Sequence, residues 1–536
     1  MPIEYIPFRN TNYFSSLICD YLEKKATLDD FYELRPTIEN FRKQIELKKT
    51  SKLLSETNRT VLSTSIKQQC DSLDLSLQTL RNIEALKEQN TFTVTTGHQL
   101  NLFTGPLYFI YKIVSTINLC KQLKQHYPKY NFVPVYWMAT EDHDFEEINF
   151  FNFQGKKIQW NRKASGAVGE LKLDGLQEVF EVFSTQLNVS QNAKQLKRLF
   201  EQAYLNHNTL TEATRFLVNA LFSEYGLVIV DGNDKNLKQL FVPFIKDELT
   251  NKTSYKKVIE TNHALTALSE DYKIQVNPRE INLFYIKQGI RERIVENNGN
   301  YNVLNTEISW NKTDILKEVE AHPERFSPNV ILRPLYQEVI LPNLCYIGGG
   351  GELAYWFQLK SNFEAHSVTF PMLLLRNSVL MLSEKQYQKL RKLDLEFQDL
   401  FMKQPELISK VTKKISKLQI DFSTQKEHLK EQFKALYDLA KHTDESFLGA
   451  VGAQERKQIK GLENLEKRLL KAQKRKLSDI LERVKSLQNQ LFPNQGLQER
   501  QINFSEFYLE YGDQLIQQLV LHLQPLKSEF VILKLD

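Results

Sequence analysis

The alternation of apolar and polar positions between residues 92 and 138 predicts a strand, a helix and a second strand. Residues 92–95 form a short run with high β propensity, and residues 106–127 place apolar side chains at near-helical spacing. Residues 132–138 are almost continuously apolar, which is typical of a strand covered on both faces. A strand–helix–strand unit of this kind indicates a parallel sheet with helical crossovers.

Further apolar runs predict three more core strands, at residues 226–232, 330–333 and 370–375. Between them the pattern changes to short antiparallel strands mixed with amphipathic helices, over residues 148–225 and 273–325. We therefore expect one α/β core over residues 1–378, with insertions at about 148–225 and 273–325.

Beyond about residue 380 the chain is rich in Lys, Glu and Gln and carries heptad-like apolar spacing. One arm has apolar residues seven positions apart, at Ile415, Phe422, Leu429 and Leu436. A second arm repeats apolar residues at three- and four-residue spacing after position 477. The two arms predict a long antiparallel α-helical coiled-coil hairpin over residues 379–492, with its turn near Gly449 and Gly452. Residues 493–536 are expected to return to the core as a helix and a strand.

Composition and charge narrow the classes of protein that this chain can represent. Among 536 residues, 70 Lys and Arg balance 65 Asp and Glu, and the net charge of +5 argues against a dedicated nucleic-acid binder. No run approaches the roughly 18 apolar residues of a membrane span. The four cysteines form no C-x-x-C motif, and the N-terminus lacks a secretory signal pattern. The sequence therefore predicts a soluble protein of the reducing cytoplasm, with neither membrane nor nucleic-acid partners.

The first candidate cluster follows the first core strand, where ligands bind in open α/β sheets. Gly97 and Gly105 permit close backbone approach, and the start of the next helix favours an anion such as a phosphate. Polar side chains are added at His98, Gln99, Asn101 and Thr104. The alternative is a capped loop with a structural histidine. Neither common phosphate-loop motif is present.

The second cluster follows the second core strand and contains Glu141, Asp142, His143 and Asp144. Carboxylates beside an imidazole suit proton transfer, binding of a substrate amine, or a divalent metal. No second ligand pair has a recognisable spacing, so a metal is not indicated. Asp231, at the carboxyl end of a further predicted strand, is another candidate for substrate binding.

The third cluster combines Arg333 and Gln337 with a glycine run at Gly348, Gly349, Gly350 and Gly351. Such a run before a helix leaves backbone N–H groups available to an anion. Glu352, Tyr355 and Trp356 follow on that helix as candidate substrate-binding residues. The alternative is a flexible turn, with these three side chains serving as cap and core.

Three segments carry a family resemblance: TTGHQLNLFTGPLYFIYK, VPVYWMATEDHDFEEIN and ILRPLYQEVILPNLCYIGGGGELAYWFQLK. Together with the late coiled coil, they resemble the bacillithiol biosynthesis cysteine-adding enzymes, in order from about residue 90 to the C-terminus. The resemblance implies a Rossmann-like core with inserted connective subdomains and a coiled coil that helps to form a homodimer. It also implies a ligase that joins cysteine through an amide bond to the amine of glucosaminyl-malate, giving bacillithiol.

The core also looks related to the nucleotidyl-transferase folds of class I aminoacyl-tRNA synthetases, which activate a carboxylate with ATP. Their first signature is absent here, because only His98 stands at that turn. The run Lys414-Ile415-Ser416-Lys417 matches the second signature superficially, but it falls on the predicted heptad seam. These departures count against adenylation, so the cofactor is unknown and ATP is only a possible activator. Two alternatives stay open: another nucleotide-dependent ligase or nucleotidyl transferase acting on an amino acid, and a non-catalytic coiled-coil scaffold.

Chemical roles can be assigned as hypotheses for amide formation. Attack requires a neutral amine and hence a general base, for which His143 or Asp142 is the candidate. His98 or Asn101 could steady the developing oxyanion. Asp144 could hold an ammonium group, and Arg333 could pair with the malate carboxylates.

Overall fold

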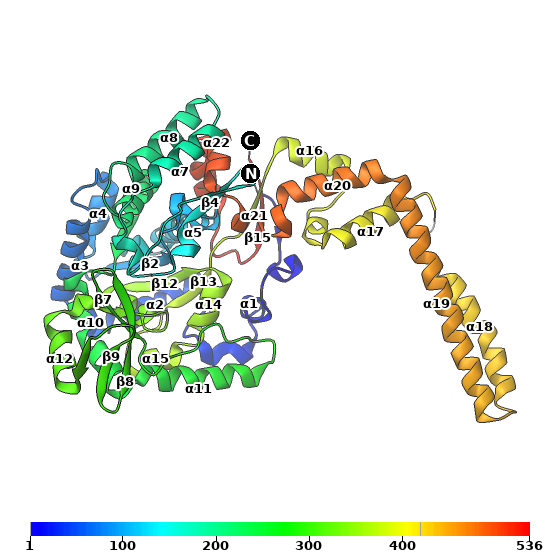
Figure 1. The fold of residues 1–536 in the computed structure, drawn as a ribbon, viewed down its shortest axis with the longest axis horizontal. Coiled ribbons are helices and arrows are strands. Elements are labelled where there is room, and N and C mark those ends of the chain that lie inside the picture. Colours follow the sequence, from blue (N-terminus) through cyan, green and yellow to red (C-terminus); the bar gives the residue numbers. More distant parts are fainter. Residues whose placement is uncertain (1, 419, 536) are drawn as a thin grey trace. The chain divides into compact units, whose positions relative to one another are not determined.

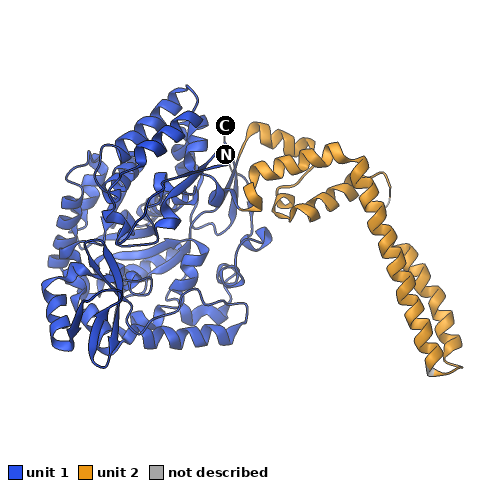
Figure 2. Cartoon of the chain, in the orientation of Figure 1, with its two compact units in different colours: residues 1–381, 497–535 blue, residues 382–496, 536 orange. Residues whose placement is uncertain are grey.

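The computed structural model describes residues 2–418 and 420–535. They form two compact units, one of residues up to 381 together with 497–535, and one of residues 382–496 (Figure 2). The second unit is therefore an excursion of the chain from the first. Among the described residues, no helix is both long enough and apolar enough to span a bilayer.

A five-stranded parallel sheet forms the centre of the first unit, in the order β13-β12-β2-β3-β6 (Figure 1). The strands are β2 (Thr91–His98), β3 (Asn131–Met138), β6 (Val228–Asp231), β12 (Asn343–Gly348) and β13 (Met372–Leu375). Every residue of β2 is buried, which explains why its sequence does not alternate. The register pairs His98 with Met138 and Met138 with Asp231, so the carboxyl ends of three strands meet at one edge.

Helices cover this sheet and bury its apolar side chains. The crossover between β2 and β3 is α5 (Tyr108–His126), and α2 (Ile38–Lys49) joins it in one core with β2, β12 and β13. The other helices of this part are α1 (Ser16–Leu22), α3 (Glu56–Gln69), α4 (Leu77–Ala85), α6 (Phe145–Ile148), α13 (Arg333–Ile340), α14 (Gly350–Trp356) and α15 (Lys360–Ala365).

Two groups of elements interrupt the parallel sheet. The first is a hairpin followed by three helices: β4 (Phe150–Phe153), β5 (Lys156–Gln159), α7 (Leu176–Gln186), α8 (Gln191–Tyr204) and α9 (Leu210–Phe222). The second is a five-stranded sheet of order β10-β9-β8-β7-β11. Its strands are β7 (Leu283–Lys287), β8 (Ile290–Asn297), β9 (Asn300–Val303), β10 (Ser309–Asn311) and β11 (Phe326–Pro328). In the chain, α10 (Lys235–Asn251) and α11 (Thr253–Leu268) precede this sheet, and α12 (Lys312–Ala321) lies between β10 and β11.

The last segment of the first unit brings the chain back beside its beginning. It contains α21 (Gln498–Gln501), α22 (Phe504–Tyr511), α23 (Gln514–His522) and β15 (Phe530–Leu535). β15 lies between β1 (Pro2–Ile6) and β14 (Val379–Ser383), and it runs antiparallel to β1.

One predicted core strand is wrong. Residues 330–333 form a turn and the start of α13 rather than a strand, and the neighbour of β2 in the sheet is β12. The Asn329 side-chain oxygen accepts hydrogen bonds from the Ile331 and Leu332 N–H groups, which bends the chain there. Pro334 then stands in the first turn of α13, a position where proline favours a helix. Apolar content alone could not separate these possibilities.

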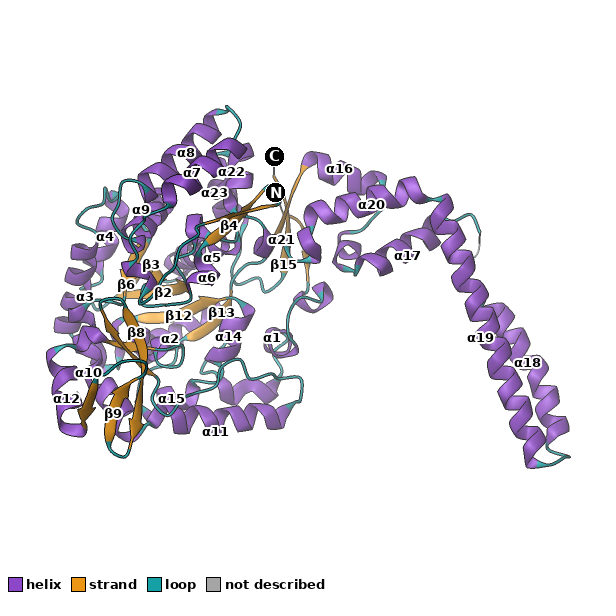
Figure 3. Cartoon of the chain, viewed as in Figure 1, coloured by secondary structure: helices purple, strands orange, loops and turns teal. Residues whose placement is uncertain are grey.

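Between residues 384 and 491, every regular element among the described residues is helical (Figure 3). The main helices are α16 (Glu384–Lys392), α17 (Gln404–Ile415), α18 (Ser423–Ala440), α19 (Glu445–Lys476) and α20 (Ser478–Leu491). Helices α18 and α19 pair as the hairpin, around a small core of Phe433, Ala440 and Val451.

The structure corrects three details of the hairpin. The turn lies at residues 441–444, because the Asp444 side chain caps α19, and Gly449 and Gly452 therefore lie inside that helix. The first arm is broken after Ile415, where α17 ends. There the Ser416 side-chain oxygen accepts a hydrogen bond from the Leu418 N–H, and this local bond replaces the helical backbone pattern.

The third detail is the face that α18 presents. Leu436, which belongs to the predicted heptad spacing, is 41% exposed, and Leu439 beside it is 58% exposed. The residues that pack against α19 are instead Leu429, Phe433, Tyr437 and Ala440, at helical three- and four-residue spacing.

Candidate active site

A cavity of about 810 Å³ lies at the carboxyl edge of the parallel sheet. Its wall combines the ends of β2 and β3, parts of α5, α13 and α14, and one face of the inserted β7–β8 ribbon. Ten of the residues predicted from sequence line it: Gly97, His98, Gln99, Glu141, Asp142, His143, Asp144, Arg333, Glu352 and Tyr355. This position is the one that ligands occupy in open α/β sheets.

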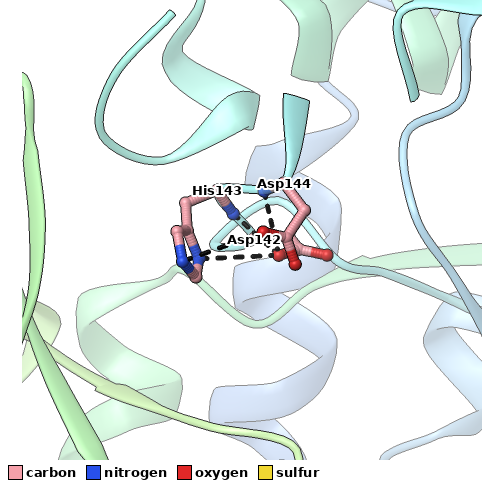
Figure 4. Close-up of side chains that lie close together, drawn as sticks. All are labelled: Asp142, His143 and Asp144. Carbon is pink, nitrogen blue, oxygen red and sulfur yellow. Dashed lines mark hydrogen bonds and ion pairs between the residues drawn. The ribbon is translucent and has the colours of Figure 1, made fainter. Parts of the chain in front are cut away.

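The carboxylate of Asp142 holds the loop after β3 together (Figure 4). Asp142 Oδ1 accepts hydrogen bonds from the His143 N–H at 2.7 Å and the Asp144 N–H at 3.4 Å. Its other oxygen accepts from Gln99 Nε2 at 2.9 Å. The imidazole lies between two acids, with Nδ1 3.8 Å from Asp142 and Nε2 3.9 Å from Asp144. Asp142 therefore shapes the loop, while His143 and Asp144 project from it.

Arg291 of β8 reaches across from the inserted sheet to this loop. Its guanidinium contacts Nδ1 of His143 and lies 4.0 Å above the Phe284 ring. A guanidinium can only donate, so Nδ1 is the acceptor and a neutral His143 carries its proton on Nε2. Burial lowers the pKa of Arg291, and the negative charges of Glu141, Asp142 and Asp144 oppose that shift.

The same loop brings three potential metal ligands together. One ligand atom from each of Asp142, His143 and Asp144 lies within 4.8 Å of the others. However, the Arg291 guanidinium already contacts Nδ1 of His143, and Asp142 already binds backbone N–H groups. These existing contacts leave the three groups poorly placed to share one cation.

Glu141 lines the cavity but is already paired. Its carboxylate binds Lys238 of α10, whose side chain is only 1% exposed and also donates to the Glu324 carbonyl at 3.2 Å. The pair anchors the loop after β3 to α10.

A second ion pair, between the buried Lys112 and the partly exposed Glu352, forms the floor of the cavity. Lys112 Nζ lies 2.6 Å from Glu352 Oε1 and donates to the Gly97 carbonyl at 2.7 Å. Glu352 also accepts from the Tyr346 hydroxyl at 2.7 Å and the Gly349 N–H at 3.1 Å. Burial acts to raise the pKa of Glu352, but Lys112 and these donors hold it below its ordinary value. The pair ties the ends of β2 and β12 to α5.

His98 and Arg333 complete the inner wall. Burial lowers the pKa of His98 well below its usual range, and the positive charges of Lys112 and Arg376 act in the same direction, so the ring is neutral. Arg333 donates to Gln337 at 3.0 Å and to the Tyr355 hydroxyl at 3.4 Å. Among the described residues, no carboxylate lies within ion-pair distance of Arg333.

The other predicted residues lie outside the cavity wall: Asn101, Thr104, Gly105, Asp231, Gln337, Gly348, Gly349, Gly350, Gly351 and Trp356. Asn101 donates to the Glu147 carbonyl, and Asp231 lies 3.6 Å from Arg215. Trp356 is fully buried against Tyr346, as expected for a core residue. The Gly349 N–H that the glycine run would offer to an anion is taken by Glu352.

Sequence inspection missed several residues of the wall, namely Tyr108, Lys112, Arg279, Arg291, Arg293 and Tyr346. Lys112 could have been found from the sequence, since a lysine within the apolar face of a helix needs a partner. No sequence feature pointed to Arg291 and Arg293, because their segment was expected to be an insertion away from the site. Only the tertiary fold brings it to the carboxyl edge.

This fold and cavity define a Rossmann-like α/β protein with a charged site at the carboxyl edge of its sheet. Residues 1–377 match the family model of the bacillithiol biosynthesis BshC N-terminal Rossmann-like domain, and residues 379–535 match that of the BshC C-terminal coiled-coil domain.

Relatives match from end to end. The chain is 59% identical to the "Putative cysteine ligase BshC" of Christiangramia forsetii, over 99% of both chains. It is 58% identical to the protein of the same name from Flavobacterium johnsoniae, over 99% of this chain and 100% of the relative. It is 27% identical to that of Chlorobaculum tepidum, over 96% of both. The chain belongs to the BshC family of bacillithiol biosynthesis, which confirms the resemblance and the Rossmann-like and coiled-coil fold expected from the sequence.

Proposed function

We propose that the protein is a ligase that joins the carboxyl group of L-cysteine to the amine of glucosaminyl-malate, forming bacillithiol. The observation that carries the proposal is the cavity, in which an acid–imidazole loop faces arginines that lack carboxylate partners among the described residues. Such a site suits an ammonium group and carboxylates on one ligand. The full-length relatives named as cysteine ligases support the same activity.

The reaction needs an activated carboxyl group, because amide formation from a free carboxylate in water is uphill. We propose a phosphoanhydride such as ATP as the activator. A cysteine carboxylate oxygen attacks phosphorus, and ADP or pyrophosphate leaves. The amine then attacks the carbonyl, the C–N bond forms, the bond to the phosphoryl oxygen breaks, and the amine proton passes to a base.

We rank the candidates for these roles by their contacts and their position in the cavity. His143 is the stronger base candidate, because both Asp142 oxygens already accept hydrogen bonds that shape the loop. His98 is the stronger oxyanion candidate, since it lines the cavity and its Nε2 has no hydrogen-bond partner, whereas Asn101 lies outside the wall. Asp144, with its side chain 55% exposed, can receive the ammonium group before deprotonation.

The direct test uses purified protein with cysteine, glucosaminyl-malate and ATP, followed by mass spectrometry of bacillithiol, AMP and ADP. The expected result is bacillithiol with stoichiometric AMP, for an adenylate, or ADP, for an acyl phosphate. His143→Ala should lower the rate at least about 100-fold. His126→Ala is the matched control, because that exposed ring is hydrogen-bonded to the Gln122 carbonyl at the end of α5. Full activity of His143→Ala would remove this residue from the scheme.

We also propose that the hairpin supports a homodimer. Leu436, Leu439, Phe447 and Leu448 are each at least 40% exposed near the tip of α18 and α19. A second copy could bury these side chains. Light scattering of wild type and of a Leu439→Lys variant tests the proposal, and a monomeric wild type would refute it.

Two further parts of the organisation stand as proposals. We propose residues 1–378, 379–492 and 493–536 as the core, the hairpin and the returning segment, with the core insertions at about 148–225 and 273–325. We propose a cytoplasmic location, supported by four cysteines that are all unpaired and buried.

A further inference from the structure

One face of the inserted β7–β8 ribbon forms part of the cavity wall. Phe284, Arg291 and Arg293 all line the cavity, and the register places Phe284 directly opposite Arg293. Residues two apart in a strand share a face, so the two arginines point to the same side. The ribbon therefore presents two guanidinium groups to the site.

Both guanidinium groups lack a carboxylate partner. No Asp or Glu oxygen among the described residues lies within ion-pair distance of Arg291 or Arg293, although both side chains are partly buried. By contrast, Arg325 of the same inserted region pairs with Glu318 at 2.7 Å. The negative charges of Glu141, Asp142 and Asp144 offset part of the burial of Arg291. Among the described residues, however, no carboxylate forms a direct ion pair with either guanidinium, so both keep donors for an anion.

Arg291 has a second role in the ligand-free site. Its guanidinium contacts Nδ1 of His143, and the Phe284 ring packs against both side chains, 4.0 Å from the guanidinium carbon and 5.4 Å from the imidazole centroid. The lone pair of Nδ1 is thereby occupied, and the Nε2 proton faces Asp144. In this state His143 has no free nitrogen with which to accept a proton.

We propose that Arg291 and Arg293 form the subsite for the carboxylates of the acceptor, and that a carboxylate draws Arg291 away from His143. The freed Nδ1 then accepts the proton of the attacking amine, as the C–N bond forms and the phosphoryl oxygen leaves the activated cysteine. This inference rests on the proposed ligase function and adds a means of regulating it. The base becomes available only when the acceptor's own carboxylates bind. The activated cysteine is then protected from base-catalysed attack by water until the acceptor has bound.

The test compares two acceptors, glucosaminyl-malate and its malate dimethyl ester, by kcat/KM. Wild type should prefer the dicarboxylate at least about 100-fold, because the ester leaves two cations unpaired. Arg291→Met keeps an apolar stem next to Phe284 but removes the guanidinium and its charge. It should lose about 100-fold with the dicarboxylate and gain about threefold or more with the ester, whose reaction then has a free base. Arg293→Gln should lose about tenfold with the dicarboxylate.

Lys287→Gln is the matched control, since Lys287 lies on the same ribbon but is exposed and outside the cavity wall. It should leave both rates unchanged. Equal losses of Arg291→Met with both acceptors would show a purely structural role and overturn the proposal, and unchanged rates would overturn it as well.

Failure of the ligase function is distinguishable from failure of this subsite. If wild type forms no product with either acceptor, calorimetric titration with L-malate still tests the arginines. Binding that Arg293→Gln weakens about tenfold and Lys287→Gln retains supports the subsite. Absence of malate binding to wild type, or equal binding to both variants, overturns it.

Discussion

Replacement of Arg376 by Met should destabilise the first unit by several kcal/mol. Arg376 follows β13, and Glu499 lies in α21, so the pair joins the chain just before it leaves this unit to the chain just after it returns. The pair is bidentate, at 2.9 and 2.7 Å, and the side chains are only 3% and 1% exposed. Met replaces only the aliphatic stem of Arg and leaves the carboxylate buried without its counter-charge.

The magnitude follows from what remains around Glu499. Its two other donors are the Ser378 hydroxyl and the Val379 N–H, both neutral and both at 3.3 Å. They cannot replace a bidentate guanidinium, and breaking a buried pair from one side costs about 3–5 kcal/mol. In Arg376→Met with Glu499→Gln the buried charge is gone, and the amide oxygen can still accept from one of the two donors, which bind different oxygens of Glu499. The double variant should therefore lose only about 1–2 kcal/mol.

Urea unfolding followed by tryptophan fluorescence measures this loss. All four tryptophans, Trp137, Trp160, Trp310 and Trp356, belong to the first unit, so the signal does not report the hairpin. The control is Lys257→Met, which breaks an exposed pair with Glu260 and should cost less than about 1 kcal/mol. The reasoning would be refuted if the double variant were as unstable as the single one, or if the single one matched the control.

Three further predictions concern the residues around the cavity. The unfolded state protonates His98 below about pH 6.5 while the folded state keeps it neutral, so stability is full above that pH and falls below it. Between pH 7.5 and 5.5, wild type should lose about 1.3 kcal/mol more than His98→Asn in urea unfolding, and parallel losses would contradict the pKa direction. Lys112→Met should lower the free energy of unfolding by about 2–4 kcal/mol in the same assay, and Glu352→Gln should partly restore it. Full stability of the single variant would contradict a stabilising role of this ion pair. Gly232→Ala places a Cβ 2.5 Å from the Trp137 ring and should cost about 1–3 kcal/mol, whereas an unchanged midpoint would show that the ring can move aside.

Much of the fold could be predicted because the parallel strands are buried on both faces. Runs such as residues 132–138 have no polar alternation, and the crossover helix between two of them is amphipathic. The error at residues 330–333 has the opposite origin, because a short apolar run is compatible with strand, turn or buried helix. Asn329 and Pro334 decide in favour of a helix start, through local hydrogen bonds that apolar periodicity does not report.

The site was predictable to the extent that it sits at strand ends. The loop after β3 follows directly from a buried strand, so its first polar residues had to emerge at the carboxyl edge. The glycine run was overestimated as an anion site, because the sequence does not show that Glu352 folds back onto the Gly349 N–H.

By itself, the sequence determined a parallel α/β core, a helical hairpin and two polar loops at the ends of adjacent strands, because hydrophobic periodicity and the succession of strands and helices along the chain are local properties. Only the tertiary structure decided which charges are already neutralised and which remain available to a ligand. Glu141 is paired with Lys238 and Glu352 with Lys112, whereas Arg291, from a strand about 150 positions further along the chain, contacts His143. Ion pairing in a cavity depends on distances of a few ångströms between residues far apart in sequence, and no pattern along one chain records those distances.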